Sequence, residues 1–116
     1  MPTATDELSM VFHALADPTR RSMLERLSRG DATVGELGAP FSMSAPAVSQ
    51  HLRVLEKAKL IERRARAQWR VCSLSHEPLD EAAAWVERNR QAWQTRFDQL
   101  DAVLAEADPA QTAPGR

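Results

Sequence analysis

Hydrophobic residues recur with a helical period between Ser44 and Lys57, so this stretch is predicted to form one amphipathic helix. A step of about 100° per residue places Val48, Leu52 and Leu55 on a single apolar stripe. Ser44 is a suitable N-cap, because its hydroxyl can accept a hydrogen bond from an early backbone N–H group. The opposite face is polar and cationic and consists of Pro46, Ser49, Gln50, Arg53 and Lys57.

The polar face of this helix carries side chains of the types that proteins use to read base pairs. Glutamine can pair with adenine, arginine with guanine, and serine with either. Lys57, at the end of the helix, is suited to a phosphate group and also to the negative end of the helix dipole. A helix with one polar face is equally typical of a surface that meets only water, so the neighbouring elements decide between the two interpretations.

Two helices are predicted ahead of this stretch. Residues 6–16 have a helical period, and Asp17 with Pro18 supplies the N-cap and the first position of a second helix. The second helix is expected to run to about Ser28 and to end at Gly30. The apolar stripe of the first helix consists of Leu8, Val11, Phe12 and Leu15.

A third, short helix is predicted over residues 34–37. Thr33 and Glu36 have the spacing of a capping box, and residues 31–33 form a connector or one short strand. The turn 38–43 then leads into the amphipathic helix. Two helices joined by a short turn, the second with a basic outer face, are typical of a helix-turn-helix.

A β-hairpin is predicted directly after the amphipathic helix. Residues 60–64 and 69–74 alternate well enough for two strands, and residues 65–68 lie between them. The tip is basic but has no glycine or Asn-Gly pair, so a loose four-residue loop is expected in place of a tight turn. A hairpin in this position is the wing of a winged helix, so the fold class is mainly α with one β-hairpin.

The last helix is expected from Leu79 to Glu106, with no internal glycine or proline and a length of roughly 40 Å. A small core cannot cover so long an apolar stripe, so the stripe is predicted to be the seam of a homodimer, together with the first helix. Packing of this helix on the protein's own first helix is the alternative. The apolar residues in question are Trp85, Trp93, Phe97, Leu100 and Leu104.

Charge is distributed unevenly along the 116 residues, although the formal net charge is only −1. Residues 41–72 have seven Lys or Arg against two acids, and residues 77–108 have three Arg against eight acids. A basic middle segment between acidic ends indicates a polyanionic partner for the middle segment alone. One domain is expected over residues 6–106, with disordered tails at 1–5 and 107–116.

Several classes of protein are not expected. There is no run of 18 apolar residues, and acids stand where a signal peptide would have bases, so a cytoplasmic protein without a membrane partner is predicted. The single cysteine, Cys72, is expected to be a strand residue and excludes an internal disulfide framework. No nucleophile–base pair or glycine-rich phosphate loop is present, so neither an enzyme nor a cofactor is predicted.

The segments FHALADPTRR (residues 12–21) and SAPAVSQHLRVL (residues 44–55), followed by the arginine-rich hairpin, resemble the ArsR family of bacterial winged-helix repressors. The resemblance runs from about residue 7 to about residue 105 and implies a homodimer formed by the first and last helices. It further implies that the fourth helix enters the major groove and that the wing touches the flanking DNA backbone. The residues expected to contact DNA are Ser44, Pro46, Ser49, Gln50, Arg53, Lys57, Arg63, Arg64, Arg66 and Gln68.

The sequence departs from the metal-sensing members of that family. Residues 33–37 contain no cysteine where such members have a Cys-x-Cys pair, and the last helix has carboxylates but no histidine. Transition metals prefer thiolate and imidazole ligands, so no metal site is predicted and the effector stays open. His51 is expected to serve in packing and hydrogen bonding. A winged helix that binds another protein and no specific DNA site is the alternative function.

Overall fold

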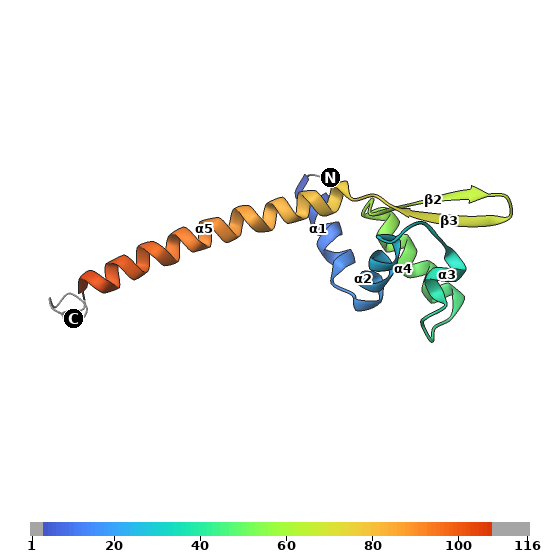
Figure 1. The fold of residues 1–116 in the computed structure, drawn as a ribbon, viewed down its shortest axis with the longest axis horizontal. Helices are drawn as coiled ribbons and strands as arrows, with labels where there is room; N and C mark the ends of the chain where they lie inside the picture. Colours follow the sequence, from blue (N-terminus) through green and yellow to red (C-terminus); the bar gives the residue numbers. More distant parts are fainter. Residues whose placement is uncertain (1–3, 108–116) are drawn as a thin grey trace. The chain divides into compact units, whose positions relative to one another are not determined.

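The computed structural model describes residues 4–107 of the chain (Figure 1). Within them, one compact unit ends at Ala82 and a second consists of residues 83–107. The tails predicted at 1–5 and 107–116 lie outside the described residues, except that residues 4, 5 and 107 are helical. The elements are α1 (Ala4–Leu15), α2 (Pro18–Leu27), β1 (Ala32–Thr33), α3 (Val34–Gly38), α4 (Ala45–Lys57), β2 (Ile61–Arg66), β3 (Trp69–Leu74) and α5 (Glu77–Ala107).

The three predicted helix N-caps are confirmed. The Asp17 carboxylate accepts the Arg20 N–H at 3.0 Å, and the Ser44 hydroxyl accepts the Ala47 N–H at 3.3 Å. Thr33 and Glu36 form a reciprocal capping box, with distances of 3.1 and 2.8 Å. Each bond satisfies a backbone N–H that the helix itself leaves without a partner, and this is why α2, α3 and α4 begin where the sequence predicts.

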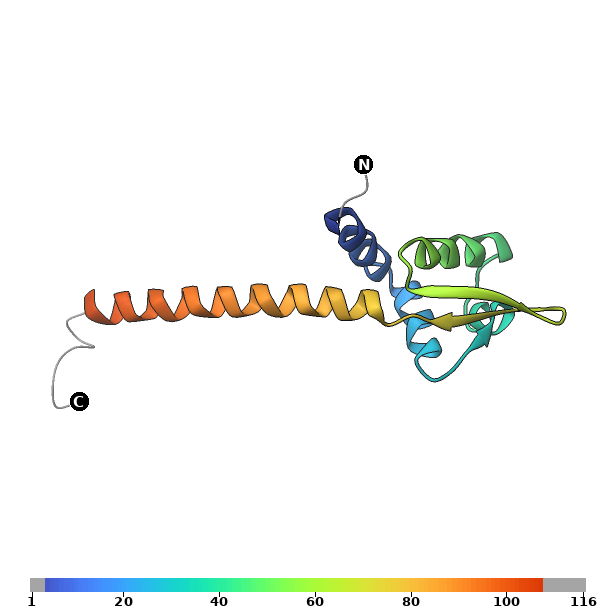
Figure 2. The same ribbon diagram turned by 90° about the horizontal axis from the view of Figure 1, so that it is seen from above.

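The core of the first unit lies between the helices and the sheet. The predicted stripe of α4 is buried, and α4 packs against α1, α2, α3 and β2 (Figure 2). Burying each such aliphatic side chain stabilises the fold by roughly 1.5–3 kcal/mol. The largest fully buried side chains are Met23, Leu37, Leu52, Leu55, Leu60, Ile61 and Cys72.

The sheet has three antiparallel strands in the order β1-β3-β2. The short strand foreseen before α3 is present, and Ala32 pairs with Cys72 of β3. The loose four-residue tip predicted for the hairpin is wrong. Arg66 pairs with Trp69, so both strands continue to a two-residue turn in which Ala67 has a φ of 54°. The additional strand pairing offsets the cost, of order 1–2 kcal/mol, of a left-handed residue other than glycine.

The chain passes from α4 into β2 through a second left-handed residue, Lys59, with a φ of 63°. Its N–H donates to the Glu56 carbonyl at 2.9 Å, and the Leu60 N–H donates to the Leu55 carbonyl at 3.0 Å. These two bonds are the Schellman pattern that ends a helix by satisfying its last carbonyls. These bonds fix the turn through which α4 leads directly into the wing.

The long last helix is confirmed and spans 31 residues. Ala82, in its first part, is 4% exposed and belongs to the core of the first unit. The apolar side chains beyond it are exposed, including Trp93 at 56% and Phe97 at 61%. No helix within residues 4–107 is both long enough and apolar enough to cross a membrane.

Candidate nucleic-acid interface

The two faces of α4 differ as the sequence predicts. Val48, Leu52 and Leu55 are buried, whereas Gln50 and Arg53 are exposed on the other side. The Arg53 guanidinium donates to Oε1 of Gln50 at 3.2 Å, so the two polar groups lie side by side. Of the other residues predicted on this helix, Ser44, Pro46 and Lys57 are exposed and Ser49 is half-buried.

Close packing between α3 and α4 depends on Gly38, the last residue of α3. A Cβ atom at this position would lie 2.9 Å from Cγ2 of Val48. Real Cβ atoms do not approach other atoms so closely, so a side chain at this position would force Val48 or the two helices to shift. Gly38 therefore sets the spacing within the helix-turn-helix.

Arg20 is a buried arginine, only 8% exposed, that sequence reasoning did not single out. Its Nε and Nη2 donate to the carbonyls of Ala14 and His13, both at 2.9 Å, and its Nη1 lies 3.2 Å from Nδ1 of His51. The hydrogen-bonding role predicted for His51 is thus confirmed. The Asp17 carboxylate is nearby, and the hydrogen bond that it accepts from the Arg20 backbone N–H lowers its pKa.

The wing presents exposed cations near its tip. Arg64 and Arg66 are exposed on β2, and Gln68 is exposed in the turn. An Arg64 nitrogen lies 3.5 Å from Oδ2 of Asp31, but the side chain remains 59% exposed, so this ion pair is weak. Both arginines therefore keep their charge available to a phosphate group.

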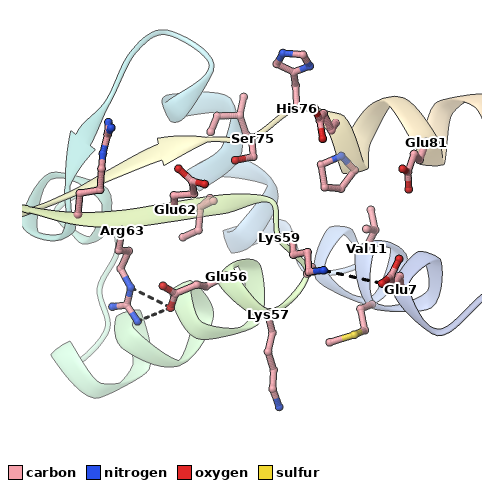
Figure 3. Close-up of a pocket in the computed structure, with 17 residues that line it drawn as sticks. Glu7, Val11, Glu56, Lys57, Lys59, Glu62, Arg63, Ser75, His76 and Glu81 are labelled. Carbon is pink, nitrogen blue, oxygen red and sulfur yellow. Dashed lines mark hydrogen bonds and ion pairs between the residues drawn. The ribbon is translucent and has the colours of Figure 1, made fainter. Parts of the chain in front are cut away.

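Arg63 differs from Arg64 and Arg66 because its guanidinium is already bound within the protein. Its Nη2 and Nε donate to Oε1 of Glu56 at 2.8 and 3.2 Å (Figure 3). These bonds raise the pKa of Arg63, and its side chain is only 22% exposed. Arg63 thus links β2 to the last turn of α4.

Trp69 is a second residue that sequence reasoning did not assign to the site. It is 56% exposed and pairs with Arg66 at the end of the hairpin. Side chains directly opposite each other in an antiparallel pair project from the same face of the sheet. The tip of the wing therefore combines a large apolar surface with a cation. The alternation of residues along the strands could have placed Trp69 beside Arg66, but a search for basic residues alone does not find a tryptophan.

An open groove of about 1130 Å³ lies beside the wing, lined by α1, the α4–β2 turn, the hairpin and the first turns of α5 (Figure 3). Its walls have both signs of charge, and Lys59 forms a 4.0 Å ion pair with Glu7 across it. His76 is 3.0 Å from Asp80, and both are well exposed. Within residues 4–107, no group of three or more His, Cys, Asp or Glu side chains is arranged to hold a metal ion.

Cys72 is a strand residue, as predicted, and its side chain is fully buried. Desolvation raises the pKa of its thiol, which keeps the sulfur protonated and poorly reactive near neutral pH.

The residues predicted for the dimer seam fall into two groups. On α1, Val11 is 4% exposed, and Leu8, Phe12 and Leu15 are half-buried against the core of their own unit. On α5, Trp93, Phe97, Leu100 and Leu104 are each more than half exposed, and Trp85 is 38% exposed. Among the residues predicted for this seam, the side chains that are more than half exposed all lie on α5.

Comparisons with known proteins agree with this description. A family model described as a helix-turn-helix domain matches residues 15–64, which include α2, α3 and α4. The chain is 35% identical over 79 residues to the transcriptional repressor SdpR of Bacillus subtilis, covering 68% of this chain and 88% of that protein. It is 44% identical over 79 residues to the HTH-type transcriptional regulator Rv2034 of Mycobacterium tuberculosis, covering 68% of this chain and 72% of the relative.

Solved structures show the same fold. A crystal structure of an ArsR family transcriptional regulator is 39% identical, with a TM-score of 0.75 over 81% of this chain and 97% of that one. An ArsR-like transcriptional regulator from Rhodococcus sp. RHA1 is 28% identical, with a TM-score of 0.73 over 84% of this chain and 92% of that one.

Proposed function

This chain belongs to the ArsR family of DNA-binding transcriptional repressors, and from that premise we propose that it acts as a homodimer on an inverted-repeat operator. The operator is expected to control the chain's own gene or an adjacent operon. The relatives named above are regulators of transcription, which favours DNA over a protein as the partner of the winged helix.

The observation that carries this proposal is the exposed polar face of α4. Gln50 and Arg53 lie together on that face, opposite the buried stripe. An α-helix fits the major groove of B-DNA, where arginine pairs with guanine and glutamine with adenine. We assign base reading to these two residues and to Ser49. We assign phosphate contacts to Lys57 and to the N-terminus of α4, where Ser44 and Pro46 lie.

The wing is proposed to add contacts outside the major groove. Arg64 and Arg66 have exposed charges that a phosphate can neutralise, and Gln68 lies in the turn between the strands. Trp69 offers a flat apolar surface for the sugars of the DNA backbone. We propose an indirect role for Arg63 in place of the expected DNA contact, because its Nε and Nη2 already donate to Glu56.

The dimer is proposed to form through the exposed stripe of α5. Four large apolar side chains at positions 93, 97, 100 and 104 recur with a spacing of four, three and four residues. This spacing is the a/d repeat with which two helices pack together. The first helix adds only its half-buried residues, because Val11 is already buried within its own unit.

A two-fold dimer determines the shape of the DNA target. Two copies of α4, about 34 Å apart, would meet successive major grooves on one side of the duplex. The operator is therefore expected to be an inverted repeat with half-sites centred roughly 10–11 base pairs, or one further turn, apart.

Selection of bound duplexes from a random DNA pool tests the proposal, with footprinting on the chain's own upstream region as the second arm. An enriched inverted repeat that is also protected upstream of the gene supports it. Enrichment of no sequence, or of a single unrepeated half-site, would contradict it.

A further inference from the structure

The guanidinium of Arg20 joins three helices of the DNA-binding unit. Arg20 lies in the first turn of α2. Its guanidinium donates to the carbonyls of Ala14 and His13 near the end of α1 and contacts His51 in the middle of α4. On the basis of the proposed base-reading role of α4, we propose that Arg20 and His51 are positioning residues that fix how α4 is rotated about its own axis. Neither side chain belongs to the polar face assigned to base reading.

The direction of the Arg20–His51 hydrogen bond follows from the chemistry of arginine. A guanidinium can only donate, so Nδ1 of His51 is the acceptor in this hydrogen bond. The Asp17 carboxylate, 3.8 Å from the same Nδ1, balances the positive charge of Arg20. The contact therefore requires an acceptor at the δ position of residue 51.

Apolar packing constrains the rotation of α4 less sharply than a hydrogen bond does. Contacts of Val48, Leu52 and Leu55 depend on the area that they bury and have little directional preference. A hydrogen bond weakens steeply when its angle changes, and this one joins α4 to a buried, multiply anchored guanidinium. The Arg20–His51 bond thus adds an angular constraint on α4 to the constraint that hydrophobic packing supplies.

Rotation of α4 matters because Gln50 directly precedes His51 and Arg53 is two residues further on. Bidentate pairing with a base edge requires the side chain to be held within roughly 0.5 Å and 10–20° of the correct geometry. Phosphate contacts tolerate larger displacements, because charge attraction is long-ranged compared with a hydrogen bond. Loss of the Arg20–His51 bond should therefore reduce specific binding and spare non-specific binding.

The test compares two amide substitutions at residue 51. His51→Asn places an oxygen at the δ position and keeps the acceptor for Arg20, whereas His51→Gln places it one bond further out. Binding is measured to a duplex selected by the wild-type protein and to a scrambled duplex of the same composition. We expect His51→Gln to bind the selected duplex about tenfold more weakly and the scrambled duplex within about twofold of wild type. His51→Asn should remain within about threefold of wild type on both duplexes.

Hydrogen exchange of the free variants supplies a readout that does not depend on DNA. His51→Gln should speed exchange of the amides of α4 relative to those of β2 and β3, and His51→Asn should not. Equal behaviour of the two variants, in exchange or in DNA binding, would overturn the proposal. A wild-type protein that does not prefer the selected duplex would refute the proposed function instead, and the exchange result would still decide the role of Arg20 and His51.

Discussion

The Arg63 guanidinium donates two hydrogen bonds to the same carboxylate oxygen of Glu56, so the first strand of the wing is joined to the last turn of α4. The Schellman bonds of Lys59 and Leu60 fix the backbone turn that connects the same two elements. The wing and the proposed recognition helix are thus coupled at two places. A change in the orientation of one element should therefore change the orientation of the other.

The first prediction concerns this ion pair. Glu56→Gln removes the negative charge that binds Arg63, so it should weaken operator binding. Because the substitution removes no cation, the dependence of the affinity on salt should not change. Both side chains are partly exposed, so the loss of stability should stay at about 1 kcal/mol or less. The slope of log affinity against log salt concentration is the measurement. If Arg63→Ala flattens this slope as strongly as Arg64→Ala, Arg63 contacts a phosphate directly and the indirect role is wrong.

The exposed arginines of the wing are expected to contribute non-specific affinity. Replacing Arg64 and Arg66 by alanine should weaken binding to every DNA sequence, because released counterions drive phosphate contacts. The salt slope should flatten by about one unit for each phosphate contact that is lost.

Trp69→Ala is the matched comparison for the wing, because it removes apolar area from the same tip without removing charge. It should lower the affinity and leave the salt slope unchanged. If the wing stays away from DNA, Trp69→Ala should leave the affinity unchanged.

Metal ions should not release the protein from DNA. Residues 33–37 have no thiolate, the last helix has no histidine, and residues 4–107 contain no group of at least three suitable ligands. A mobility-shift experiment with micromolar Zn²⁺, Cd²⁺ or Ni²⁺ should give the same affinity as one with a chelator. Stoichiometric binding of a metal that abolishes the shift would contradict this.

The dimer prediction is tested by placing a charge on the exposed stripe of α5. Trp93→Asp should give a monomer that binds DNA weakly and without sequence preference, because burying a carboxylate in an apolar seam is costly. Gln91→Asp adds the same charge on the opposite side of the helix and should remain dimeric. Sedimentation at micromolar concentration distinguishes the two states. A wild-type protein that sediments as a monomer would show that the stripe of α5 has another role.

Local patterns in the sequence predicted those parts of the fold that local chemistry determines. Asp17, Thr33 and Ser44 cap their helices through bonds to N–H groups three residues away, so short spacings predicted where α2, α3 and α4 begin. The buried and exposed faces of α4 followed from the helical period alone. The turn at Ala67 was missed because nothing in an alanine signals a left-handed conformation.

Contacts between distant residues could not be predicted in this way. Arg20 and His51 are 31 positions apart, and whether their side chains meet depends on how α2 and α4 pack. The contact between Arg63 and Glu56 could not be predicted either, although these residues are only seven positions apart. It depends on the shape of the turn between α4 and β2, which the sequence did not indicate. The composition of the wing indicated a basic surface, but not which of its arginines are free.

The claim on which the account depends is that the exposed face of α4 reads bases. The most direct measurement compares Gln50→Ala and Arg53→Ala with wild type on the selected duplex and on its scrambled form, with Arg29→Ala as an exposed arginine outside α4 and the wing. We expect a loss of about 1–3 kcal/mol on the selected duplex for each of the first two variants, a much smaller loss on the scrambled duplex, and no change for the control. Equal losses on the two duplexes would contradict base reading by this face.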